Sequence, residues 1–210
     1  MKDIFEEEST EALLLVDAEN AFNKLNRKAA IHNIKQLCPS FHQFLSNTYQ
    51  LPAQLIINDS NGSESLSSEE GSTQGDVCAM GMYAVATRPL INILQEKTNQ
   101  DQCKQVWYAD DSSGGGKIKE IKKWWDEMNI SGPKFGYFPK PSKTILIVKD
   151  PSLLPFAEET FADTGVKITV EGERHLGAVI GSNIGREDLN CEQPSSRRRF
   201  GMASPTFSIL

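Results

Sequence analysis

Apolar residues recur along the chain as short continuous runs, at residues 13–16, 55–57, 106–108 and 145–148. Runs of this length and composition favour buried β-strands. Residues 166–170 alternate between apolar and polar side chains, which predicts a further strand. Asn61 and Gly62 predict a tight reversal between the 55–57 run and the polar segment 63–69, which we expect to be a loop or an edge strand.

Apolar residues at helical spacing predict helices between these strands. We expect one helix from residue 27 to about residue 37, with Asn26 as its N-cap, and a second that starts at Pro39. Further helices are expected at about 77–95 and at about 118–128, and the latter has apolar residues on one face and lysines on the other. The alternation of strands and helices predicts an α+β domain.

Length and composition are those of one ordinary globular domain. The chain has 210 residues and is 39% hydrophobic, which is enough for a packed core. Its apolar runs are too short to cross a membrane, and residues 1–10 are too acidic for a secretory signal. Four scattered cysteines match neither a disulfide framework nor a zinc site, so we expect an intracellular protein of the cytoplasm or nucleus. Beyond about residue 182 the pattern stops, and residues 183–210 are expected to form a disordered or non-homologous tail.

The overall charge does not favour a nucleic-acid-binding protein. The net charge is -6 and the isoelectric point is near 5.2, whereas binding to phosphates usually relies on lysine and arginine. Basic residues nevertheless cluster locally, at residues 117–123, 134–149 and 197–199. Because salt screens charges over about 8 Å, an acidic protein with a basic channel can still bind a nucleic acid.

Two acidic positions that follow apolar strands are the main candidates for chemistry. Residues 106–111 (VWYADD) form a predicted strand that ends in Asp110 and Asp111, and we expect residues 112–116 to form the turn behind them. Adjacent carboxylates repel each other unless a cation compensates, and Mg²⁺ prefers carboxylate oxygen. The 13–16 run leads directly into Asp17. If the two strands are neighbours, Asp17 and Asp110 meet at one sheet edge and form a site for two metal ions.

Three segments, in this order, resemble the central motifs of reverse transcriptases. They are residues 16–27 (VDAENAFNKLNR), 71–76 (GSTQGD) and 108–111 (YADD), and the closest similarity is to the enzymes of retrotransposons and other retroelements. The resemblance covers about residues 13–182. It implies a polymerase palm-like antiparallel sheet backed by helices, with partial fingers and no thumb, over residues 1–182. It also implies an RNA-directed DNA polymerase that acts on a primed RNA or DNA template with deoxynucleoside triphosphates.

The resemblance also assigns roles to individual residues. Asp17, Asp110 and Asp111 would be the catalytic carboxylates that bind two Mg²⁺ ions, with Mn²⁺ as a possible substitute. Phe22 would pack beneath the sugar of the incoming nucleotide, where its ring excludes a 2′-hydroxyl.

Three further positions match nucleotide-binding residues of that family. Gln74 and Gly75 would border the nucleotide pocket and the template base. Lys143 would face the triphosphate and protonate the leaving pyrophosphate. Residues 174–177 (RHLG) resemble the hairpin that supports the primer strand.

Two alternatives to an active polymerase remain. The chain starts close to Asp17 and ends soon after the predicted hairpin, so the parts that usually hold the nucleotide phosphates and the duplex are expected to be missing. That favours a catalytically inactive retroelement fragment. The other alternative is an acidic interaction module whose motifs are coincidental.

Overall fold

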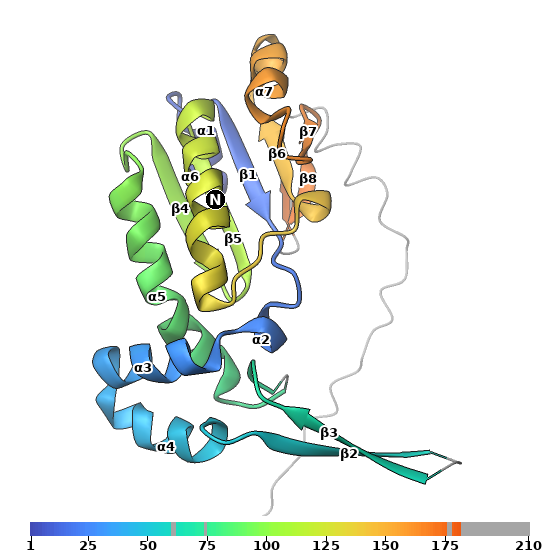
Figure 1. Ribbon diagram of the computed structural model, residues 1–210. Coiled ribbons are helices and arrows are strands. Elements are labelled where there is room, and N and C mark those ends of the chain that lie inside the picture. The colour runs from blue at the N-terminus through green and yellow to red at the C-terminus, as the bar shows by residue number, and fades with distance from the viewer. Residues whose placement is uncertain (60–61, 74, 176–177, 182–210) are drawn as a thin grey trace, which may run out of the picture.

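The computed structural model describes residues 1–59, 62–73, 75–175 and 178–181. The expected 183–210 tail, Gln74 and Asn61 lie outside these residues. Five strands form the main sheet in the order β4-β5-β1-β6-β7 (Figure 1). Their bounds are β1 Ala12–Val16, β4 Cys103–Tyr108, β5 Asp111–Gly116, β6 Ile145–Val148 and β7 Lys167–Thr169.

Two short ribbons lie outside this sheet. One pairs β2 (Ala53–Asp59) with β3 (Gly62–Ser68), and the other pairs β8 (Glu173–His175) with β9 (Ala178–Ile180). The helices are α1 Lys2–Glu6, α2 Ala21–Lys24, α3 Arg27–Leu37, α4 Pro39–Tyr49, α5 Ala79–Lys97, α6 Ile118–Ser131 and α7 Leu154–Phe161.

The predicted α+β class is confirmed, but the sheet is mixed rather than antiparallel. β4, β5, β1 and β6 are antiparallel neighbours, whereas β7 runs parallel to β6. The parallel pair arises because the chain crosses over through α7 between β6 and β7, and such a crossover returns the chain in the same direction.

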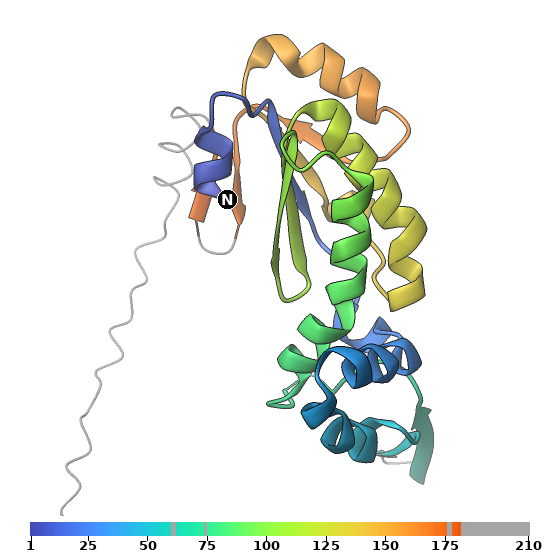
Figure 2. The same cartoon turned by 90° about the vertical axis from the view of Figure 1, so that its left-hand side faces the viewer.

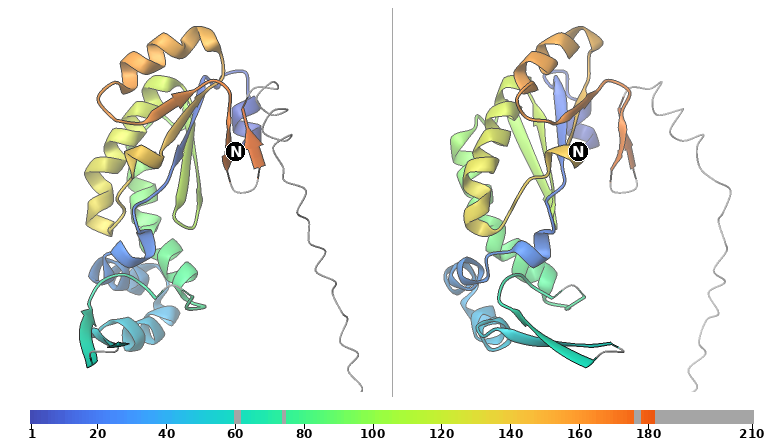
Figure 3. Two further views of the ribbon diagram at one scale, coloured as in Figure 1. Left: turned by 90° about the vertical axis from the view of Figure 1, so that its right-hand side faces the viewer. Right: turned by 45° about the vertical axis from the view of Figure 1, so that its right-hand side comes forward.

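Strand β1 is the centre of the fold, and every one of its residues is buried. Leu14 and Val16 face the larger core, together with residues of α5 and α6. Leu13 and Leu15 face a smaller cluster on the opposite side, which includes Phe5 of α1. Figures 2 and 3 show α5 and α6 on one face of the sheet, with α1 and the β8–β9 ribbon on the other. A strand covered on both faces explains the continuous apolar run in its sequence.

The segment expected to be a turn, residues 112–116, is instead most of the buried strand β5, between β4 and β1. Its glycines are required by close packing. A Cβ at Gly114 would lie 2.8 Å from the Trp124 ring of α6, and one at Gly115 would lie 2.6 Å from Ile4. The strand is therefore formed from small residues because large side chains from both neighbouring layers fill the space above and below it.

Candidate active site

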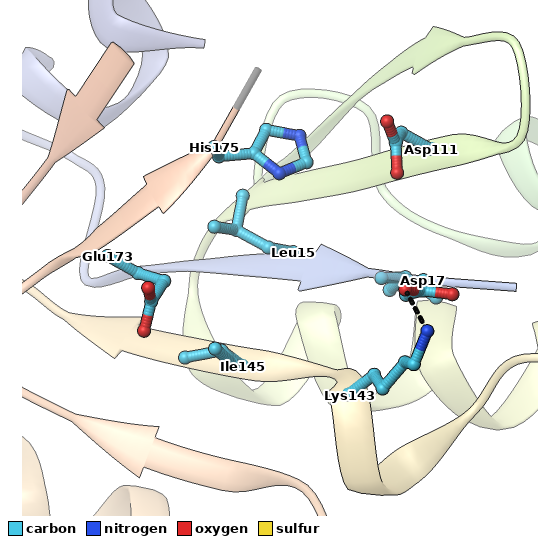
Figure 4. Close-up of a pocket in the computed structure, with 8 residues that line it drawn as sticks. Leu15, Asp17, Asp111, Lys143, Ile145, Glu173 and His175 are labelled. Atoms are coloured by element: carbon cyan, nitrogen blue, oxygen red, sulfur yellow. Dashed lines mark hydrogen bonds and ion pairs between the residues drawn. The ribbon is translucent and has the colours of Figure 1, made fainter. Parts of the chain in front are cut away.

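The register of the sheet brings Asp17 and Asp111 together. Val16 pairs with Ser112 across the antiparallel β1–β5 ladder, so Asp17, which follows β1, lies beside Asp111, the first residue of β5. Both line a cavity of about 240 Å³ at this end of β1 (Figure 4). The other lining residues are Leu15, Val16, Lys143, Ile145, Glu173 and His175.

Lys143 is held next to Asp17 by backbone pairing. The Lys140 amide donates to the Asp17 carbonyl at 2.8 Å, and the Glu19 amide donates to the Phe138 carbonyl at 2.8 Å. Lys143 follows in a short 3₁₀ helix, Pro141–Lys143, and its Nζ donates to Asp17 Oδ2 at 3.2 Å (Figure 4). Lys143 therefore lies beside the first carboxylate, and its expected contact with the triphosphate stays a prediction.

The surroundings of Asp111 disfavour the ionised form of its carboxyl group. Burial raises the pKa of Asp111, and the negative charges of Asp110 and Asp17 raise it further, while His175 acts in the opposite direction. A carboxylate in this setting is stabilised by an added cation, because the cation offsets both the repulsion and the lost hydration.

Asp110 lies in the turn of the β4–β5 hairpin and is not among the residues that line the cavity. The sheet register places Asp111 beside Asp17, because β5 lies between β4 and β1, and the expected meeting of the Asp17 and Asp110 carboxylates stays a prediction. Tyr137 is completely buried, and its hydroxyl donates to the Asp110 carbonyl at 3.1 Å and contacts Ser112 Oγ at 2.9 Å. Ala109, in the same turn, has φ of +54°, which is uncommon for a residue with a side chain.

Two of the residues expected to contact the nucleotide, Phe22 and Gly75, lie on α2 and on the loop before α5, outside the lining of the cavity. Phe22, on α2, is half-buried and packs on Tyr83 of α5, with ring centroids 4.9 Å apart. Gly75 has φ of +93°, and a Cβ built there would meet no atom within 4 Å. Neither residue lines the cavity that contains Asp17. Gln74 lies outside the described residues.

The loop that contains Gly75 is fixed at both of its ends. The Ser72 amide donates to the Phe22 carbonyl at 2.7 Å, and the Arg27 Nε donates to the Gly71 carbonyl at 3.0 Å. On the other side, the Tyr49 hydroxyl donates to the Asp76 carboxylate, and this bond is the main cause of a lowered Asp76 pKa. The loop is therefore attached to the α2–α3 segment that follows Asp17.

Glu173 is a lining residue that the sequence did not indicate. It shares β8 with His175, for which the sequence suggested a structural or phosphate-contacting role, and both side chains reach the cavity. Their spacing of two residues places them on one face of a strand, which is the pattern that could have identified Glu173. His175 Nε2 is buried without a hydrogen-bond partner in the described part of the chain, and burial lowers the His175 pKa.

The donor chemistry of the cavity suits a hard divalent cation, since Asp17 and Asp111 supply carboxylate oxygens. Within the described ranges, however, no group of three or more His, Cys, Asp and Glu side chains is arranged to hold a metal ion. Asp110, in the adjoining turn, would be the third carboxylate of such a set.

Solved structures of telomerase, a reverse transcriptase, have a similar fold. Apo telomerase from Candida tropicalis matches with a TM-score of 0.62 and 12% identity, over 86% of this chain and 33% of the telomerase chain. The same telomerase with a TWJ fragment of telomeric RNA matches with a TM-score of 0.61 and 13% identity, over 85% and 30%. Telomerase from Candida albicans with such a fragment matches with a TM-score of 0.56 and 10% identity, over 82% and 30%.

These similarities establish a reverse-transcriptase-like fold for the chain, which spans about a third of each telomerase chain. No protein-family model and no curated protein sequence matches it. None of the helices among the described residues is long and apolar enough to span a membrane.

Proposed function

We propose that this chain is the nucleotidyl-transfer palm of a retroelement RNA-directed DNA polymerase. The observation that carries the proposal is the shared cavity of Asp17 and Asp111, which come from adjacent antiparallel strands, with Lys143 paired to Asp17 at 3.2 Å. Carboxylates beside a cationic donor suit a reaction in which a triphosphate is cleaved and pyrophosphate leaves.

Each residue then has a stated role. Asp17 and Asp111, with Asp110 from the adjoining turn, would hold Mg²⁺ or Mn²⁺, which when bound neutralises the charge that develops at the α-phosphate. Lys143 would release Asp17, contact the triphosphate and give a proton to the leaving pyrophosphate. Phe22, Gln74 and Gly75 would border the sugar and base of the deoxynucleotide. The remaining substrate is a primer paired to an RNA or DNA template.

A catalytically inactive retroelement fragment is the second candidate. One observation favours it, the net charge of -6. Among the described residues that line the cavity, Lys143 is the only lysine or arginine. These are the side chains that keep a positive charge at neutral pH. A polymerase normally needs more positive charge than this around a triphosphate.

The test is metal-dependent nucleotide binding by the purified chain. Binding of a fluorescent deoxynucleoside triphosphate is measured by anisotropy with and without Mn²⁺, in wild type, Asp17→Asn and Asp111→Asn. We expect Mn²⁺-dependent binding that falls at least about tenfold in both variants, since each loses a charged ligand worth at least about 1.4 kcal/mol. Asp101→Asn, at an exposed turn, is the control and should bind like wild type. Metal-independent binding, or equal binding by all four proteins, would refute the proposal.

A further inference from the structure

Negative charge is absent from one long segment of this acidic chain. Residues 20–58 contain no Asp or Glu, although the chain has 28 of them. The same segment carries Lys24, Arg27, Lys28 and Lys35, together with His32 and His42. It forms helices α2, α3 and α4 and most of β2, so the fold collects this positive charge at one end of the molecule (Figure 1).

A large groove lies against this acid-free segment, and Glu69 and Glu70 from outside the segment also line it. Its volume is about 780 Å³, and its walls come from α3, α4 and the segments that flank the β2–β3 ribbon. Lys28, His32 and Lys35 share one exposed face of α3 and line the groove. They are spaced at i, i+4 and i+7, so the two ammonium groups are anchored about 10 Å apart along the helix. This separation allows each lysine to contact a different phosphate.

The two lysines are available for a ligand. Neither Lys28 nor Lys35 forms an ion pair with a carboxylate in the described part of the chain. Many lysines elsewhere in the molecule do form such pairs, namely Lys2, Lys104, Lys117, Lys122, Lys123, Lys143 and Lys167. The charge on this face of α3 is therefore not neutralised by the protein itself.

Arg27 and the two acids of the groove have structural partners. The Arg27 guanidinium donates to the carbonyls of Gly71, Ser68 and Glu70 at 3.0, 3.0 and 2.8 Å. Glu70 Oε2 accepts the Arg27 amide at 2.8 Å, and Glu69 accepts from Ser67 at 3.2 Å. These contacts fix the rim of the groove and leave the α3 lysines as its free cations.

We propose that this groove binds single-stranded nucleic acid, with Lys28 and Lys35 on the phosphates. Other lining side chains suit exposed bases, since His32 and His42 can stack and Gln43 and Gln50 can both donate and accept hydrogen bonds. A concave groove of this volume admits one strand, whereas a duplex presents a convex surface. Binding here does not require the cavity of Asp17 and Asp111, so the inference goes beyond the proposed polymerase chemistry.

The test measures binding of a fluorescein-labelled 12-nucleotide single-stranded RNA to the full chain by anisotropy, at several salt concentrations. The groove variant is Lys28→Glu/Lys35→Glu. Its matched control is Lys97→Glu/Lys123→Glu, which changes the net charge equally at exposed positions outside the groove. We expect the groove variant to bind at least about tenfold more weakly, and its salt slope to fall by about 1.4, or about 0.7 for each lost phosphate contact.

The control variants and competitors in this experiment distinguish binding in the groove from an effect of net charge. The control pair should bind like wild type, which would support the groove even if the chain has no polymerase activity. Equal weakening of the groove and control pairs would show that only net charge matters and would overturn the proposal. Absence of binding by wild type, or complete displacement by inorganic polyphosphate at the same phosphate concentration, would also overturn it.

Discussion

At the scale of single residues, the candidate site contains a carboxylate whose negative charge destabilises the folded protein. Asp111 is half-buried beside Asp110 and across from Asp17, and its pKa is raised. A folded-state pKa above the unfolded value means that the ionised carboxylate destabilises the folded protein, and that stability is recovered as the pH falls through the folded pKa. Charge arranged against stability in this way is characteristic of functional sites.

This electrostatic cost predicts the behaviour of Asp111→Asn. The substitution should raise the melting temperature by a few degrees at pH 7, because it removes a desolvated charge and its repulsion. This gain in melting temperature should become smaller at pH values below the Asp111 pKa, because the wild-type carboxyl group is already neutral there. Thermal unfolding at pH 4 to 8 measures this, and added Mg²⁺ should stabilise wild type but not the variant. A variant that is less stable than wild type at pH 7 would contradict the repulsion argument.

Phe22 allows a second prediction at this scale. If its ring packs beneath the sugar, then Phe22→Ala should narrow the preference for deoxynucleotides over ribonucleotides. Competition binding with Mn²⁺ present measures the ratio of the two dissociation constants. Because Phe22 also packs on Tyr83, a stability loss of about 3–5 kcal/mol is an upper bound for the truncation, and Phe22→Leu serves as a milder variant. Equal weakening for both nucleotides would mean that Phe22 serves the core alone.

At the scale of elements, the sequence predicted the amphipathic helices well and one central strand poorly. The Asn26 side chain accepts the Ala29 amide at 3.0 Å at the start of α3, as its sequence position suggested. The predicted face of α6 is buried, and β6 spans the four residues of its apolar run. Strand β5 has none of the usual signals, because its small residues are selected by what packs on them. That information lies in Trp124 of the following helix α6 and in Ile4, which is distant in sequence.

The packing of β5 predicts a sharp difference between two glycine substitutions. Gly114→Ala should destabilise the fold by about 1–3 kcal/mol, because the new methyl group must displace the Trp124 ring. Gly81→Ala in α5 is the control, since the nearest atom to its Cβ is 3.9 Å away, and it should stabilise by up to about 1 kcal/mol. Urea unfolding of the two variants and wild type measures both. Similar stabilities would contradict the account of β5 as a strand selected for small residues.

The same limits apply to the site. The residues that line the cavity follow from strand order, and the strand order could not be read from local pattern. Two acids at strand ends could be identified as a pair, but the register that places Asp111 beside Asp17 depended on β5 being a strand. Glu173 reaches the site because the β8–β9 ribbon lies on the face of the sheet opposite α5 and α6.

At the scale of the whole molecule, the similarity of this chain to telomerase is clear in the fold and weak in the sequence. Identities of 10–13% to the telomerases coexist with TM-scores of 0.55–0.62. Charge is distributed unevenly over the molecule. Helices α3 and α4, at one end, contain no acidic residue, although the net charge of the chain is -6. A fold of this kind can present a carboxylate site and a separate cationic surface, because the strong screening of exposed charges keeps the two independent.

The last prediction is that the 210-residue chain is a weak polymerase on its own. Two metals and their carboxylates are insufficient unless the triphosphate and the primer end are held in line, and a misplacement of about 1 Å can cost about a hundredfold in rate. The described cavity offers Lys143 as its permanent cation, and Lys143 is paired with Asp17. Primer extension on an RNA template should therefore be slow, whereas Mn²⁺ binding should be detectable and lost in Asp110→Asn. Rapid, Asp110-dependent extension by the purified chain would show that it is a complete minimal enzyme.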